Sequence, residues 1–293
     1  MIDLDRMDAQ LAAAAGKSDV ARPRRVAVRS APVPAPTPAP APTPAPRARR
    51  RHTARPGPPA SVAELLESGQ LDEVDARIAR TSDRRDRLTW NTMRDLLAGR
   101  SAAAAAGIRE LADLGGAGDA EARDRAWTQR FWAAFEWGGE AQRFDVLDHC
   151  RERAYRFDDL DWWGNLTLLL AAMGKADEAV RAFDSALPLV AGAGGLDLMT
   201  NLVDAAALLG DGSRVAAAGR HLRAPAGSLV VVGDGVLCKG SADRYSGLVN
   251  AALGRWTKAT DCFRRAEEVH RTIGAGPFLA RTRQQASTAL AAA

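Results

Sequence analysis

Apolar residues recur at helical spacing along the chain from Ser61 to the C-terminus, in segments that end at glycine and resume a few residues later. The pattern occurs about six times, and the spacing of its glycines is 30 to 44 residues. The turn glycines are Gly69, Gly99, Gly138 or Gly139, Gly174, Gly210 and Gly254. This period is typical of stacked helical hairpins. The pattern therefore predicts an all-α fold of five or six hairpins.

The pattern also predicts where the folded part begins. Ser61 has Glu64 three residues later, the spacing of a capping box at a helix N-terminus. Before it, residues 31–46 alternate proline with other residues, which favours an extended polyproline II spacer. Residues 1–15 match one short amphipathic helix, which Gly16 ends. We expect a disordered tail over residues 1–60 and a helical domain over residues 61–293.

Two of the units share three further positions. After Gly174 and Gly254 stand a small, an aromatic and a small residue at offsets of five, nine and twelve. These residues are Ala179, Phe183 and Ala186 in one unit, and Ala259, Phe263 and Ala266 in the other. Small residues let antiparallel helices approach, and the aromatic ring fills the space between them. Both units resemble tetratricopeptide repeats, which implies hairpins stacked in a right-handed superhelix whose first helices line a concave face.

A narrower resemblance lies over residues 230–290. The loop GDGVLCKGS, the stretches RYSGL and ALGRW, and the tail IGAGPFLARTR are similar to the helical-repeat region of actinobacterial ATPase-coupled LuxR-type regulators and nucleotide cyclases. In those relatives an ATPase module precedes the repeats and a helix-turn-helix often follows. This sequence matches neither of those modules. The resemblance therefore implies a sensing or scaffolding array, and it carries over neither ATP hydrolysis nor DNA reading.

Composition changes this picture in one respect, because the basic charge is concentrated in the tail. The sequence pI is about 9.3. Residues 1–60 hold eleven basic and four acidic residues, a net charge of +7, and the other residues hold 29 basic and 32 acidic residues. The arginines Arg47, Arg49, Arg50 and Arg51 lie in this tail. They could neutralise phosphates without reading sequence, although no interleaved aromatic residues favour base stacking.

Candidate chemistry is sparse. Gly16-Lys17-Ser18 lacks the first glycine of a phosphate loop, and residues 235–241 read GVLCKGS, with lysine and glycine exchanged. Residues 233–240 are better interpreted as a long loop after a short extended segment at Leu229–Val232. The four histidines lack the spacing of helical zinc ligands, and the three cysteines are too scattered for a disulfide framework. We expect neither a cofactor nor a metal.

Two aromatic or thiol features have competing interpretations. His149 precedes Cys150, but neighbouring residues on a helix point about 100° apart, so a base and a nucleophile would not face each other. Trp127, Phe131 and Phe135 recur every four residues, which favours core packing over partner contact. We therefore predict no enzymatic activity.

The prediction for function is a non-catalytic interaction scaffold or sensor of a regulatory system, binding a protein or peptide on the concave face. Register against the turn glycines selects the contact residues Trp162, Asn165, Asn201, Asp204, Arg244 and Asn250. The alternative is a transcription regulator that contacts nucleic acid through the basic tail. No apolar run reaches the roughly 20 residues of a membrane helix, and residues 1–20 do not resemble a signal peptide, so the expected location is the cytoplasm.

Overall fold

The computed structural model describes residues 60–157, 159–193 and 195–291. The described part is mostly helical, as the sequence predicts. Its first elements are α2 (Val62–Glu67), α3 (Leu71–Arg80), α4 (Arg84–Ala98), α5 (Ser101–Gly116), α6 (Ala120–Trp137), α7 (Glu140–Arg151) and the π-helical turn η1 (Glu152–Arg156). They are followed by α8 (Leu160–Ala172), α9 (Ala176–Ala193), α10 (Leu196–Leu208), α11 (Gly212–Gly219), strands β1 (Leu229–Val232) and β2 (Leu237–Ser241), α12 (Ala242–Ala252), α13 (Trp256–Thr272) and α14 (Gly276–Ala291). The predictions for the tail lie outside the described residues.

The first described helix begins where the capping pattern places it. Ser61 Oγ accepts a hydrogen bond from the Glu64 amide at 3.2 Å, and Glu64 Oε2 accepts one from the Ser61 amide at 2.7 Å. The two side chains thus satisfy two amides that have no partner within the helix. The predicted capping box is confirmed.

The turn glycines connect the two helices of each pair. Five of the six turns have a glycine with φ between 68° and 78°: Gly69, Gly99, Gly174, Gly210 and Gly254. This left-handed conformation ends a helix and favours glycine, because a Cβ atom would be strained there. The turn after α6 differs, since Gly138 and Gly139 have φ values of −72° and −69°. There the helix ends in extended backbone instead.

The small and aromatic positions pack as predicted. Phe183 and Phe263 are 1% and 2% exposed, and the alanines at the neighbouring pattern positions are fully buried. On α12, a Cβ atom added to Gly247 would lie 2.8 Å from the Phe263 ring, so this glycine lets α12 and α13 approach. The close approach of α12 and α13 therefore depends on Gly247 and the Phe263 ring.

A β-hairpin interrupts the helices between α11 and α12. Strands β1 and β2 are antiparallel, with Leu229 opposite Ser241 and Val232 opposite Leu237. The extended segment predicted at residues 229–232 is confirmed. The prediction of a loop over residues 233–240 was wrong for its second half, which forms most of β2. All five β2 residues are buried, so tertiary packing stabilises a strand that the local sequence does not signal.

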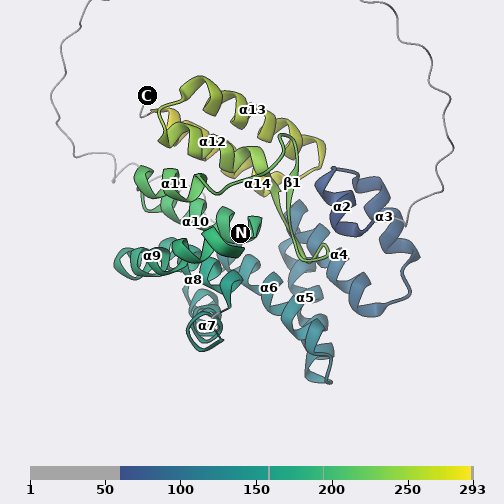
Figure 1. Ribbon diagram of the computed structural model, residues 1–293. Helices are drawn as coiled ribbons and strands as arrows, with labels where there is room; N and C mark the ends of the chain where they lie inside the picture. The colour runs from purple at the N-terminus through teal and green to yellow at the C-terminus, as the bar shows by residue number, and fades with distance from the viewer. Residues whose placement is uncertain (1–59, 158, 194, 292–293) are drawn as a thin grey trace, which may run out of the picture. The chain divides into compact units, whose positions relative to one another are not determined.

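The first helices of the pairs contact one another in a circuit. Helices α4, α6, α8, α10, α12 and α14 each contact the next, and α14 also contacts α4. At that junction a Cβ atom on Gly99 would lie 2.8 Å from Pro277 Cγ. Figure 1 shows the hairpin between α2–α4 and the C-terminal helices. The last helix thus packs on the first units, whereas a simple repeat array has contacts between successive repeats alone.

Candidate functional site

The residues that the sequence assigned to a concave face lie on α8, α10 and α12, and the structure connects four of them. Asn201 donates to Asn165 Oδ1 at 2.8 Å. Asp204 forms a bidentate ion pair with Arg244, with N–O distances of 2.7 and 2.9 Å. All four side chains are buried. The first helices of three successive pairs therefore share one polar inner face, and the chain itself covers it.

Lys239 of β2 is the residue that covers this face most directly. Its ammonium nitrogen is 2.7 Å from Asp197 Oδ1, 2.7 Å from Thr200 Oγ1 and 2.6 Å from Asn201 Oδ1. Its side chain is 1% exposed. Burial lowers the pKa of Lys239, and the Asp197 carboxylate opposes that shift. Three side-chain oxygens from the first two turns of α10 thus surround one ammonium group.

A second buried ion pair extends the face to the last helix. Arg244 donates to Gln285 Oε1 of α14 at 2.8 Å, and Gln285 Nε2 donates to Asp204 Oδ1 at 3.2 Å. Burial acts to raise the pKa of Asp204, but Arg244 outweighs burial and holds this pKa below its ordinary value. The carboxylate is therefore charged, and it links α10, α12 and α14.

Glu136 and Arg281 join α6 to α14 in the same region. Glu136 Oε1 is 2.7 Å from Arg281 Nη1, and the Glu136 side chain is 9% exposed. Burial raises the pKa of Glu136, and Arg281 opposes the shift. Trp132, one turn earlier on α6, stacks on Phe278 of α14 with 5.9 Å between ring centroids. Polar and aromatic contacts together hold the C-terminal helix against α6.

Two of the six predicted contact residues lie elsewhere. Trp162, expected on the concave surface, is 7% exposed and packs edge-on against His149 and Phe131, with centroid distances of 4.7 and 6.3 Å. Asn250 is half-buried and donates to the Ser246 carbonyl oxygen of its own helix at 2.8 Å. The assignment of Trp162 to the concave contact surface was wrong, because α6 and α7 cover the ring.

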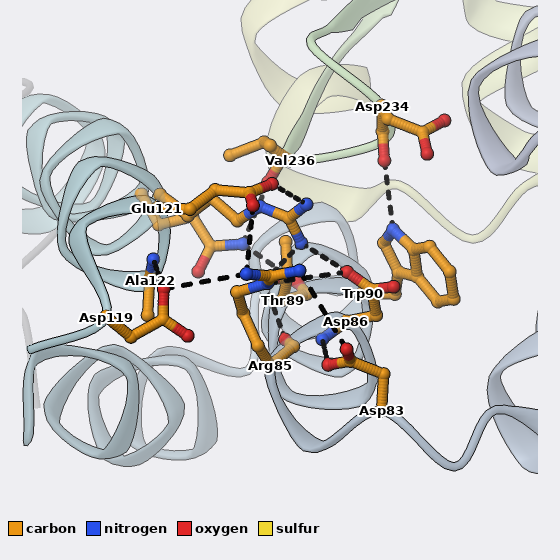
Figure 2. Close-up of polar contacts among 12 residues, drawn as sticks. Asp83, Arg85, Asp86, Thr89, Trp90, Asp119, Glu121, Ala122, Asp234 and Val236 are labelled. Carbon is orange, nitrogen blue, oxygen red and sulfur yellow. Dashed lines mark hydrogen bonds and ion pairs between the residues drawn. The ribbon is translucent and has the colours of Figure 1, made fainter. Parts of the chain in front are cut away.

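The tip of the β-hairpin is held by α4 and α6. The Trp90 indole donates to the Asp234 carbonyl oxygen at 2.9 Å, and Gln129 Nε2 donates to the Val236 carbonyl oxygen at 2.8 Å. Figure 2 shows the Trp90 ring pointing at the main chain of Asp234. The hairpin therefore spans from the inner face of α10 to the first helix pairs.

Beside the tip, charged residues join the N-terminal ends of α4 and α6. Arg85 Nη1 is 2.9 Å from Glu121 Oε2 and 3.5 Å from Asp119 Oδ1 (Figure 2). Asp83 and Asp119 also cap their helices, and hydrogen bonds from the amides of Asp86 and Ala122 lower the pKa of these two carboxyls. In this cluster each positive side chain lies close to a negative one, and we assign the cluster a structural role.

The arrangement of His149 and Cys150 does not support nucleophilic catalysis. The imidazole stacks on Trp127 with 3.9 Å between ring centroids. Cys150 is fully buried, and burial raises the pKa of its thiol. A reactive cysteine needs access and a stabilised thiolate, and Cys150 has neither. Among the packing predictions, Phe131 and Phe135 are confirmed as core residues, and Trp127 is half-buried.

The motifs that imitate a phosphate loop have other roles or lie outside the described residues. In the stretch 235–241, Lys239 contacts α10 and the backbone forms β2. Gly16-Lys17-Ser18 and the arginines Arg47, Arg49, Arg50 and Arg51 lie outside the described residues. Within the described ranges, no three His, Cys, Asp or Glu side chains are placed to hold a metal ion. The helices of that part of the chain are all too short or too polar to cross a membrane.

Sequence reasoning missed several residues that complete the polar face. They are Glu136, Asp197, Thr200, Lys239, Arg281 and Gln285. One signal was present: Lys239 is one of four lysines among forty basic residues, and it stands in an apolar stretch. A rare lysine between buried positions indicates a partner inside the protein, because an unpaired buried charge is costly.

Comparison with known proteins found no match among family models, curated proteins or solved structures.

Proposed function

We propose that this chain is a non-catalytic protein-interaction module of a regulatory or signalling system, with tetratricopeptide-like hairpins in a right-handed superhelix. Its partner would be an extended segment of another protein, bound along the inner face of α8, α10 and α12. The resemblance to the repeats of actinobacterial regulators supports the regulatory role.

One observation carries the proposal: the inner face holds an extended strand through side-chain contacts. Lys239 lies on β2, and its acceptors Thr200 and Asn201 lie on α10. Side chains on a row of helices can likewise contact the side chain of an extended segment, since the Lys239 ammonium group is bound by side-chain oxygens of α10. Binding of an extended segment is therefore within the chemistry of this face.

The test is capture of partners by the full chain, followed by reconstitution with the purified partner and calorimetric measurement of Kd. Asn165→Ala and Asn201→Ala remove the inner-face amides, and Asp261→Ala, at an exposed position of α13, is the matched control. We expect about tenfold weaker binding for the inner-face variants and no change for the control. Circular dichroism verifies that each variant is folded. A folded Asn201→Ala variant with wild-type affinity contradicts the inner-face proposal.

The alternative is nucleic-acid binding by the basic tail, which the net charge of +7 over residues 1–60 favours. A gel-shift assay with duplex DNA tests it. Binding should weaken steeply with salt, because released counterions drive phosphate contacts. It should also be lost on replacing Arg47, Arg49, Arg50 and Arg51 with alanine. The absence of any shift at low salt would end this alternative.

A further inference from the structure

Strands β1 and β2 occupy the inner face that the proposed function assigns to a partner. Strand β2 contacts α4, α12 and α13, and β1 contacts α2 and α10. The Lys239 side chain reaches Asn201, which in turn donates to Asn165. A partner segment therefore cannot reach these two amides while Lys239 is in place.

The acceptors for Lys239 form a compact set on one helix turn. Asp197, Thr200 and Asn201 stand at positions i, i+3 and i+4 of α10, so their side chains share one face. Each has an oxygen within 2.7 Å of the Lys239 nitrogen. An ammonium group has three donors. One carboxylate and two neutral oxygens therefore match both its charge and its donors.

Two aromatic rings complete this ammonium site. The Lys239 nitrogen is 5.7 Å from the centroid of the Trp132 ring and 6.0 Å from that of Tyr245. Ring faces attract cations at such distances. Arginine is a planar fork with five donors, so three acceptors clustered around one nitrogen favour lysine. The site thus prefers the ammonium group of lysine to the guanidinium group of arginine.

The hairpin is joined to other elements by individual hydrogen bonds at its tip and base. At the tip, Trp90 and Gln129 donate to main-chain oxygens of the hairpin. At the base, the Gly227 amide donates to Asp243 Oδ2 at 2.7 Å, and the Ser241 amide donates to His270 Nε2 at 2.7 Å. The hairpin also packs Leu229, Val230, Leu237 and Cys238 into the hydrophobic core, so an incoming segment has to replace apolar contacts as well as these hydrogen bonds.

We propose that the hairpin is a built-in ligand of the inner face, and that the partner displaces it with its own extended segment carrying a lysine. The lysine of the partner would take the place of Lys239 beside Asp197. Small and apolar residues would flank it, as Cys238 and Gly240 flank Lys239. This inference rests on the proposed function for the existence of a natural partner, but the exchange can be tested without one.

Lysine labelling of the full chain tests the exchange directly. Lys258 is exposed and the Lys175 side chain is 31% exposed, so both serve as internal references for an amine-reactive reagent. The probe is the acetylated peptide GVLCKGSA, residues 235–242, under reducing conditions. In excess peptide, Lys239 of the chain should be labelled about tenfold faster, while Lys258 keeps its rate. A peptide with alanine for lysine is the control, and unchanged labelling of Lys239 with the lysine peptide overturns the proposal.

A variant provides the second arm. Lys239→Ala weakens the hold of the hairpin, so the fluorescent lysine peptide should bind this chain about tenfold more tightly than wild type. Lys239→Met, which keeps the apolar stem, replaces it if the alanine variant does not fold. Failure of both variants to fold overturns the proposal, because an occupant that can leave is not required for folding.

The outcomes separate this inference from the proposed function. A natural partner whose affinity depends on Asn201 but not on Lys239 would support the proposed function and overturn the built-in ligand. Peptide exchange without any captured partner would support the built-in ligand alone.

Discussion

Arg281, on the last helix, forms an ion pair with Glu136 on α6, with 2.7 Å between Arg281 Nη1 and Glu136 Oε1. The contact joins α14 to α6, in addition to the packing of α14 on α4, α12 and α13. It also buries a carboxylate that needs this partner.

Removing the arginine should therefore destabilise the fold strongly. We expect Arg281→Ala to lower the free energy of unfolding by about 3 kcal/mol, since Glu136 remains buried without its partner. Arg283→Ala is the matched control on the same helix, because Arg283 is paired with Glu267 at the surface and is 57% exposed. Its effect should stay below about 1 kcal/mol. Urea unfolding measures both, and equal effects would show that the Glu136 pair does not hold α14.

Gly240 provides a test of how tightly β2 packs against the C-terminal helices. It has a φ of +77°, and an added Cβ atom would lie 2.5 Å from His270 Nε2 and 2.8 Å from Phe278 Cδ1. Gly240→Ala should cost about 2 kcal/mol or more, from backbone strain together with displacement of β2. Gly254→Ala is the control, since Gly254 has a φ of +68° and open space around it. Comparable unfolding midpoints for the two variants would argue against tight packing at β2.

The hairpin tip gives a prediction for dynamics. Trp90→Phe removes the hydrogen bond to the Asp234 carbonyl oxygen and should lower stability by about 1 kcal/mol. Amides of residues 229–241 should then exchange hydrogen faster, with those of α8 unchanged, because the loss is local. Trp256→Phe is the control, because Trp256 is a half-buried residue of α13 and lies outside the hairpin. Hydrogen–deuterium exchange with mass spectrometry measures both, and uniform acceleration throughout the chain would contradict a separately opening hairpin.

Asp211 gives a pH-dependent prediction. Hydrogen bonds from the Ser213 hydroxyl and from the amide and side chain of Arg214 lower the pKa of Asp211 to about 2 from its ordinary value of 3.8. The carboxylate therefore stabilises the fold above pH 4, and this contribution is lost as pH falls from 4 toward 2. Asp211→Ala should cost about 1 kcal/mol at pH 7 through loss of the α11 cap. The difference from wild type should nearly vanish near pH 2.

Urea unfolding of wild type and Asp211→Ala across this pH range provides the measurement. Asp184→Ala is the control, because Asp184 also binds Arg214 but caps no helix and is 57% exposed. A stability difference for Asp211→Ala that persists to pH 2 would contradict the assignment of the effect to the charged cap.

The sequence by itself determined the local elements. Helical spacing of apolar residues located the helices, glycines located most of their turns, and Ser61 with Glu64 located the first cap. These features depend on neighbours within one helical turn, so a single sequence contains them. The burial of Phe183 and Phe263 followed from the same local repeat.

Tertiary structure alone decided which polar residues meet. Lys239 and Asp197 are 42 residues apart, and Glu136 and Arg281 come from α6 and α14. Helical periodicity placed Asn165, Asn201, Asp204 and Arg244 on inner-facing positions, but it could not reveal that the chain covers them itself. That outcome depends on how far successive helix pairs turn and on the strand between α11 and α12, and both are set by packing between distant segments.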